Sequence, residues 1–98
     1  MLNHLVIFAV KPGCEGSLSE ALRVFESAIA QLDGLEEVSW GPNSNQSGLS
    51  LGYTHGLFSR LANIEVLKTT YWQHPAHQRL LTQLDELCLS RFAVDYES

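Results

Sequence analysis

The sequence predicts an α+β fold in which helices cover one face of a four-stranded antiparallel sheet. Four short segments are rich in β-branched and aromatic residues and end at turn residues, which is typical of strands. Three other segments repeat apolar residues at helical spacing. The resulting order, β-α-β-β-α-α-β, predicts a ferredoxin-like arrangement, and 98 residues are expected to form a single domain over residues 1–98.

Residues 2–10 form the first predicted strand, which ends at a Lys-Pro-Gly sequence. Alternation places His4 and Phe8 on one face of this strand and Leu5 and Ile7 on the other. Both faces are therefore apolar, although helices in this order can cover only one of them.

The first helix is predicted over about residues 18–32. Ser17 and Glu20 match a capping box, in which each side chain bonds a backbone N–H near the other, and apolar residues follow at helical spacing. Gly34 is expected to end this helix. Residues 36–41 predict a short second strand.

A polar stretch over residues 41–48 predicts a long connection between the second and third strands. The third strand is predicted over residues 51–58, with Tyr53 and His55 on one face. The opposite face carries small residues, which indicates that something packs closely against it.

Pro75 indicates a corner between two helices. Its ring favours the first turn of a helix and disfavours the helical conformation at the preceding residue. A helix capped by Asn63 should therefore end just after Tyr71, and another should begin at Pro75 with His74 near its cap. His77 lies in the first turn of that second helix, on the side of the following leucines. We expect Tyr71 and His77 to meet at this corner.

The last strand is predicted over residues 89–96, with Phe92 and Val94 on one face and Arg91 and Asp95 on the other. Apolar side chains of the first and last strands would be left in water on the uncovered face of the sheet. Each large one forgoes roughly 1.5–3 kcal/mol there. We therefore expect a homodimer in which two sheets pack face to face.

The composition argues against several classes of partner. A net charge of −5 without any basic run is unsuited to nucleic acid or to an anionic membrane surface. The longest apolar N-terminal run, residues 5–10, is too short to span a bilayer and has no cleavage pattern. Cys14 and Cys88 form no close pair in the sequence, which favours free thiols and a cytoplasmic location.

Several motifs resemble the stress-responsive dimeric α+β barrel (Dabb) family. They are His4 in the first strand, Gly-Tyr-Thr-His at 52–55, Tyr71, His-Pro-Ala-His at 74–77, and Asp-Tyr at 95–96. The resemblance covers nearly the whole chain in the same order. It implies a ferredoxin-like protomer, a dimeric barrel and a pocket between sheet and helices. The best-understood catalytic branch of the family is the plant polyketide cyclases, which close a linear poly-β-keto substrate by aldol condensation.

By position in these motifs, the resemblance implies Tyr71 and His77 as a catalytic pair. A neutral His77, held off its charged form by the helix terminus, suits a general base. The Tyr71 hydroxyl can donate to a developing enolate oxygen. His4 and His55 are implied as pocket-lining residues that bind the substrate.

Arg91 and Asp95 are further candidates for substrate binding. Arg91 occupies a pocket-side position where the cyclases are apolar, and it should either pair with Asp95 or bind a carboxylate or phosphate. No cofactor is expected. Some relatives bind a divalent cation, but the spacing of the histidines does not define a zinc site.

Two classes of function remain open. The first is a cofactor-free lyase or cyclase that uses Tyr71 and His77 on a small carbonyl or carboxylate compound. The second is a non-catalytic ligand-binding or stress-response barrel, in which these residues only line or brace the pocket, for example with His77 bonded to Tyr71 or Asp95. A flavin-free monooxygenase on the related dimeric fold is a weaker third interpretation.

Overall fold

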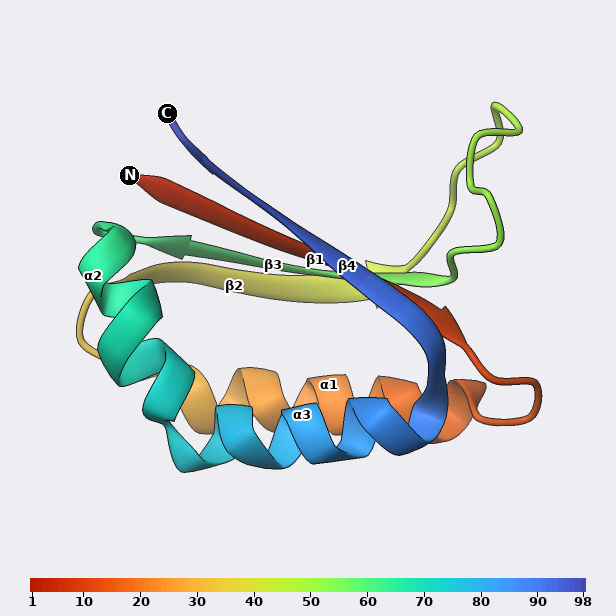
Figure 1. Cartoon of the computed structure of the whole chain (residues 1–98), viewed down its shortest axis with the longest axis horizontal. Helices are drawn as coiled ribbons and strands as arrows, with labels where there is room; N and C mark the ends of the chain where they lie inside the picture. Colours follow the sequence, from red (N-terminus) through yellow and green to blue (C-terminus); the bar gives the residue numbers. More distant parts are fainter.

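The protein, seen in a computed structural model that describes all of residues 1–98, is a sheet with a layer of helices on one face (Figure 1). The strands are β1 (Leu2–Val10), β2 (Leu35–Pro42), β3 (His55–Leu61) and β4 (Cys88–Glu97). The helical segments are α1 (Glu15–Ile29), α2 (Ile64–Val66), η1 (Leu67–Tyr71) and α3 (Pro75–Leu87). This order confirms the predicted ferredoxin-like α+β fold. None of the helices is long and apolar enough to cross a membrane.

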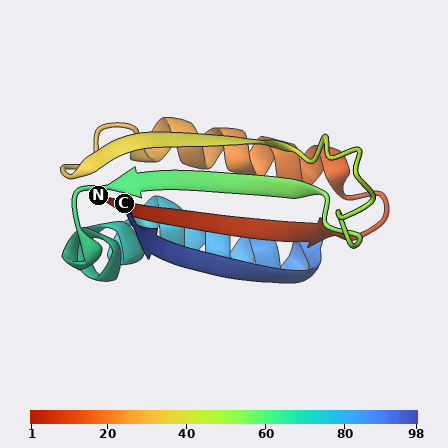
Figure 2. The ribbon, with the colours of Figure 1, turned by 90° about the horizontal axis from the view of Figure 1, so that it is seen from above.

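The strands are antiparallel and follow the order β2-β3-β1-β4, so β1 lies between β3 and β4 (Figure 2). His4 of β1 is opposite Ser59 of β3 on one side and Asp95 of β4 on the other. Residues directly opposite each other in antiparallel strands point to the same face of the sheet. These three side chains therefore share the face that the helices cover.

The core lies between the sheet and the helices α1 and α3. Phe8 of β1 and Phe25 of α1 are at most 2% exposed, and they belong to one cluster of 16 buried residues. Leu5 and Ile7 lie on the uncovered face and are only half-buried. The two faces of β1 are thus divided as the alternation predicted.

Helix α1 begins and ends about one turn earlier than predicted, and the predicted capping box is wrong. The N–H of Leu18 already donates to the carbonyl of Cys14 at 2.9 Å, so Ser17 lies inside the first turn instead of before it. No side chain caps this helix. Glu20 forms an ion pair on the helix surface instead.

The third strand begins at His55, later than predicted. Leu51 and Gly52 adopt positive φ values of 52° and 84°, which a strand cannot contain. Residues 43–54 form an arm that rises on the side of the sheet opposite to the helices (Figure 1).

The predicted corner at Pro75 is confirmed. The side chain of Asn63 accepts from a backbone N–H at the start of α2, and His74 caps α3 in the same way through its Nδ1. Tyr71 ends the first helical stretch, and His77 lies in the first turn of α3. Both side chains are buried.

The segment η1, which precedes this corner, is a π-helix that the sequence pattern did not predict. The N–H of Trp72 donates to the carbonyl of Leu67, five residues back, whereas an α-helix uses four. The hydroxyls of Thr69 and Thr70 donate to the carbonyls four residues before them, at 2.6 and 3.5 Å. The threonines thus supply side-chain donors to this wider turn, which ends with Tyr71 fully buried.

Candidate active site

A cavity of about 280 Å³ lies between the sheet and α3, next to the corner. Most of its wall is apolar and comes from both layers, through Val6, Phe8, Leu57, Trp72, Leu80, Leu81, Leu84 and Ala93. Phe92 also borders the cavity, although it pairs with Ile7 and its side chain lies on the uncovered face of the sheet. Four polar or charged side chains also line it, namely His4, Tyr71, His77 and Arg91. An apolar cavity with a few converging polar groups is typical of a small-molecule site.

Tyr71 sits between two histidine rings. The centre of its ring lies 5.7 Å from that of His4 and 5.1 Å from that of His77. Its hydroxyl is hydrogen-bonded to Oγ of Ser59 at 2.9 Å, and both residues are 0% exposed. Burial raises the pKa of Tyr71 to about 12, although the hydrogen bond with Ser59 acts in the opposite direction. Tyr71 therefore stays protonated near neutral pH and can donate a hydrogen bond.

His77 is held in one tautomer by the backbone. Its Nδ1 lies 2.9 Å from the carbonyl oxygen of Trp72, and a carbonyl can only accept, so Nδ1 carries the hydrogen. Nε2 of the neutral ring is then left as an acceptor. The partner of Nδ1 is thus neither Tyr71 nor Asp95, the two that the bracing alternative considered.

The neutral form of His77 is favoured by its surroundings. Burial lowers the pKa of the imidazole, partly offset by the hydrogen bond to Trp72 and reinforced by the charges of His4 and His74. The largest cause of this shift is burial, which disfavours the charged imidazolium.

His4 is oriented by a carboxylate. Its Nδ1 is hydrogen-bonded to Oδ1 of Asp95, the residue opposite to it on β4. Because a carboxylate accepts, Nδ1 donates, and Nε2 of the neutral ring remains as an acceptor. Asp95 does not itself line the cavity, so it acts on the site through His4.

Arg91 lines the cavity from β4, on the face that alternation predicted. Its Nη1 donates to Oδ1 of Asp85 on α3 at 2.9 Å, and not to Asp95, because Asp95 is bonded to His4. The two side chains of this pair are 32% and 69% exposed. Such a surface pair contributes only about 0–1 kcal/mol, so a competing anion can displace Asp85.

His55 lies apart from the other candidates. Its Nδ1 is 2.8 Å from Oγ1 of Thr54 and its Nε2 is 3.4 Å from Oγ of Ser19 on α1. The hydroxyl of Thr54 also donates to a carbonyl of β1, at 3.2 Å. His55 therefore ties the start of β3 to its neighbours, and it borders a separate hollow next to Ile7 and Gly56 instead of this cavity.

Ser59 is a polar contact of the site that the sequence analysis missed. The third strand was expected to end at residue 58, so the position of Ser59 on a strand face was not considered. The available signal was the alternation itself, because Ser59 continues the core-facing series of His55 and Leu57. A small polar residue at such a position should have a partner inside the protein.

Residues with metal-binding side chains are dispersed. No group of three or more His, Cys, Asp or Glu side chains could hold a metal ion, and both cysteines are unpaired. Of the four histidines, His4 and His77 line the cavity, whereas His55 contacts α1 and His74 caps α3.

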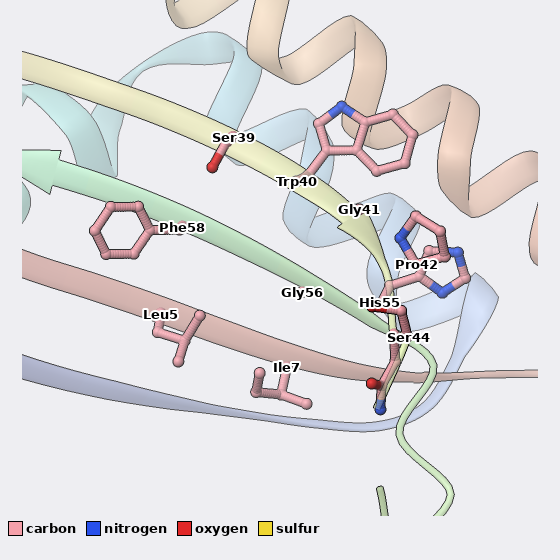
Figure 3. Close-up of a pocket in the computed structure, with 11 residues that line it drawn as sticks. Leu5, Ile7, Ser39, Trp40, Gly41, Pro42, Ser44, His55, Gly56 and Phe58 are labelled. Carbon is pink, nitrogen blue, oxygen red and sulfur yellow. The ribbon is translucent and has the colours of Figure 1, made fainter. Parts of the chain in front are cut away.

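A second hollow, of about 400 Å³, lies on the uncovered face of the sheet (Figure 3). Gly41 of β2 and Gly56 of β3 are directly opposite each other there, and neither has a side chain to fill the space. Leu5, Ile7 and Phe58 stand beside them on the same face. This hollow belongs to the face that the sequence predicted to be covered by a second copy.

The family model described as "Stress Responsive A/B Barrel Domain" (Dabb) matches residues 2–98. None of the curated proteins matches the chain. A solved dimeric ferredoxin-like protein of unknown function from Jannaschia sp. CCS1 is 28% identical, with a TM-score of 0.89 over 99% of this chain and 98% of that one.

Two further structures share the fold at lower identity. A protein of Arabidopsis thaliana is 21% identical, with a TM-score of 0.85 over 100% of this chain and 95% of that one. A hydroxynitrile lyase from Passiflora edulis is 13% identical, with a TM-score of 0.79 over 97% of this chain and 90% of that one. At these identities the likeness concerns the fold alone.

Proposed function

The chain belongs to the stress-responsive A/B barrel domain family, and we propose that it is a cofactor-free enzyme that enolises a small carbonyl compound. The observation that supports this best is a protonated phenol, Tyr71, between the imidazoles of His4 and His77 at the wall of an apolar cavity. Enolisation needs a base for a carbon-bound proton and a donor for the oxygen that gains charge. The three side chains provide both.

In the proposed step, Nε2 of His77 accepts a proton from the carbon next to the carbonyl group. The electron pair of that C–H bond forms the new C=C bond, and the π electrons of the carbonyl group move onto its oxygen. Tyr71 donates a hydrogen bond to this oxygen. If the enolate carbon then attacks a second carbonyl group, the protonated His77 returns its proton to the new alkoxide, and an aldol closure of the polyketide-cyclase type is complete.

We further propose that the compound carries a carboxylate. Arg91 is the one cationic side chain that lines the cavity, and it is held there only by an exposed pair with Asp85. A guanidinium binds a carboxylate with two parallel hydrogen bonds, which also fixes the orientation of the compound.

The test uses levulinate, a small keto acid, and 2-pentanone, a neutral ketone of the same chain length. We expect the protein to accelerate exchange of their α-hydrogens for deuterium in D2O, measured by proton NMR. Tyr71→Phe and His77→Asn should each remove most of the acceleration, and the double variant little more, because both groups act on one transition state. His77→Asn keeps a donor for the carbonyl of Trp72.

The matched control is Tyr53→Phe, a tyrosine outside the cavity. This variant should not change the exchange rate. Additive losses at positions 71 and 77 would contradict the coupled mechanism. If levulinate binds in a calorimeter but its exchange is not accelerated, the non-catalytic ligand-binding alternative is supported instead.

We also infer that two copies pack the uncovered faces of their sheets together. Phe92, Val94 and Tyr96 of β4 are 45–51% exposed on that face, and the hollow around Gly41 and Gly56 lies on the same face, on the other side of β1. A contiguous apolar face of this kind is typical of an interface. The relative from Jannaschia sp. CCS1 is itself described as dimeric.

Sedimentation at micromolar concentration tests this arrangement and should give about twice the chain mass. Ile7→Asp and Val94→Asp place a charge on the proposed interface and should each shift the protein to monomer or unfold it. Ser27→Asp, on an exposed position of α1, should leave the mass unchanged. A monomeric wild-type protein, or a dimer that survives both interface changes, would contradict the proposal.

A further inference from the structure

The hydroxyls of Ser59 and Tyr71 form an isolated pair inside the protein. Each is the only hydrogen-bond partner of the other, at 2.9 Å. Both residues are 0% exposed. Ser59 reaches this position from β3, where it lies opposite His4.

The pair contains more hydrogens than acceptors. Two hydroxyls bring two hydrogens, and a single hydrogen bond between them uses one. The other hydrogen has no acceptor within the protein. An unsatisfied donor in a buried region is unfavourable unless a ligand or an ordered water accepts from it.

The two possible directions of the bond differ in where they leave this hydrogen. If Tyr71 donates to Ser59, the free hydrogen belongs to Ser59, which does not line the cavity. If Ser59 donates to Tyr71, the free hydrogen belongs to Tyr71, which does line it. Only the second direction lets a bound molecule accept the remaining hydrogen.

We propose that Ser59 is a positioning residue for Tyr71: its hydroxyl donates to the phenol oxygen and turns the hydrogen of Tyr71 into the cavity, toward an oxygen atom of the ligand. Successive hydrogen bonds polarise one another, so the donor strength of Tyr71 increases when Ser59 donates to it. This inference builds on the proposed role of Tyr71, but it concerns the direction of a bond that can be measured without any reaction.

The test replaces Tyr71 by 3-fluorotyrosine, whose lower pKa brings the titration into a milder pH range, and follows it by fluorine NMR. A hydrogen bond donated to the phenolate stabilises it. Ser59→Ala should therefore raise the pKa of this residue by about 1. Ser59→Thr, which keeps the hydroxyl, should restore the wild-type value, and Ser59→Cys, with a weaker donor, should fall between them.

A serine hydroxyl can turn and donate to a phenolate whichever way it points in the neutral pair, so the titration tests the donor role of Ser59. Neutron diffraction of deuterated crystals at neutral pH tests the direction of the bond, and a deuterium of Tyr71 that points at Oγ of Ser59 would overturn the proposal. A pKa that falls or stays constant in Ser59→Ala would overturn the proposal, as would a rise that Ser59→Thr leaves uncorrected. If the wild-type protein accelerates deuterium exchange of levulinate, Ser59→Ala should slow this exchange about tenfold at saturation. If it does not accelerate exchange, the proposed reaction is wrong, while the fluorine titration still decides the role of Ser59.

Discussion

Removal of the phenol oxygen of Tyr71 would leave the hydroxyl of Ser59 without a partner. Ser59 is 0% exposed and does not line the cavity, so water is a poor substitute. A buried polar group that loses its partner destabilises a protein by about 1–3 kcal/mol. We expect Tyr71→Phe to lower the free energy of unfolding by this amount, although only one oxygen atom is removed.

Removal of the other hydroxyl of the pair should destabilise the protein less. Ser59→Ala leaves the hydroxyl of Tyr71, which borders the cavity and can bond a water molecule there. We expect a loss of about 0.5–1.5 kcal/mol from that variant. The double variant has no orphaned hydroxyl, so it should be more stable than the sum of the two single losses implies, by about 1 kcal/mol or more.

Urea unfolding followed by circular dichroism measures these differences. The protein concentration must be the same for all variants, since assembly into dimers makes the apparent stability depend on concentration. Tyr53→Phe serves as a control, because that hydroxyl has no hydrogen bond that the change would break. Strictly additive losses in the double variant would refute the idea that the two hydroxyls depend on each other.

Three further predictions concern other parts of the molecule. Burial lowers the pKa of His77 from an ordinary value of 6.5, so below that pH the unfolded chain binds more protons than the folded one. The contribution of His77 to the free energy of unfolding should therefore be fully present above about pH 6.5 and fall as the pH drops toward the folded pKa. Urea unfolding across this range should show a flatter dependence of this free energy on pH in His77→Asn than in the wild-type protein. Equal slopes in the two proteins would contradict the assignment. Gly34 has a φ of +87°, and a Cβ there would lie 2.8 Å from Cγ2 of Val66. Gly34→Ala should therefore reduce the free energy of unfolding by about 1–2 kcal/mol and lower the melting temperature. Val66→Ala in addition should not recover all of it; full recovery would show that the contact matters and the backbone does not. Arg91→Leu should abolish any preference for levulinate over 2-pentanone in binding, and Asp85→Asn should strengthen it, whereas an unchanged preference in both variants would exclude Arg91 as the carboxylate anchor.

The parts of the structure that local chemistry determines could be predicted. The ring of Pro75 restricts its own residue and the one before it, so the corner between Tyr71 and His77 follows from a few neighbouring residues. The two faces of β1 could also be assigned from neighbouring residues alone, because successive side chains of a strand point to opposite faces. The start of β3 was misplaced because the positive φ of Leu51 is unusual for a leucine and leaves no signal in the sequence.

The parts that depend on contacts between distant segments could not be predicted in the same way. Asp85 and Asp95 are both near Arg91 in sequence, and only the register of β1 with β4 reserves Asp95 for His4. The hydrogen bond between Ser59 and Tyr71 likewise requires that β3 and η1 are already placed. The side-chain types indicated a site, but the hydrogen-bond partners of these side chains depend on how the strands and helices are placed in the folded protein.

The π-helical turn η1 gives the site a tolerance to changes in chain length at this point. The N–H of Trp72 bonds Leu67, five residues back, so the turn holds one residue more than the α-helical turn that could replace it. Loss of one residue between Leu67 and Tyr71 would let the turn close to α-helical geometry and would leave the direction of the tyrosine nearly unchanged. In a regular α-helix such as α3, the same loss turns every residue beyond it by about 100°. A gap in this turn therefore does not by itself make the tyrosine of a relative inequivalent to Tyr71.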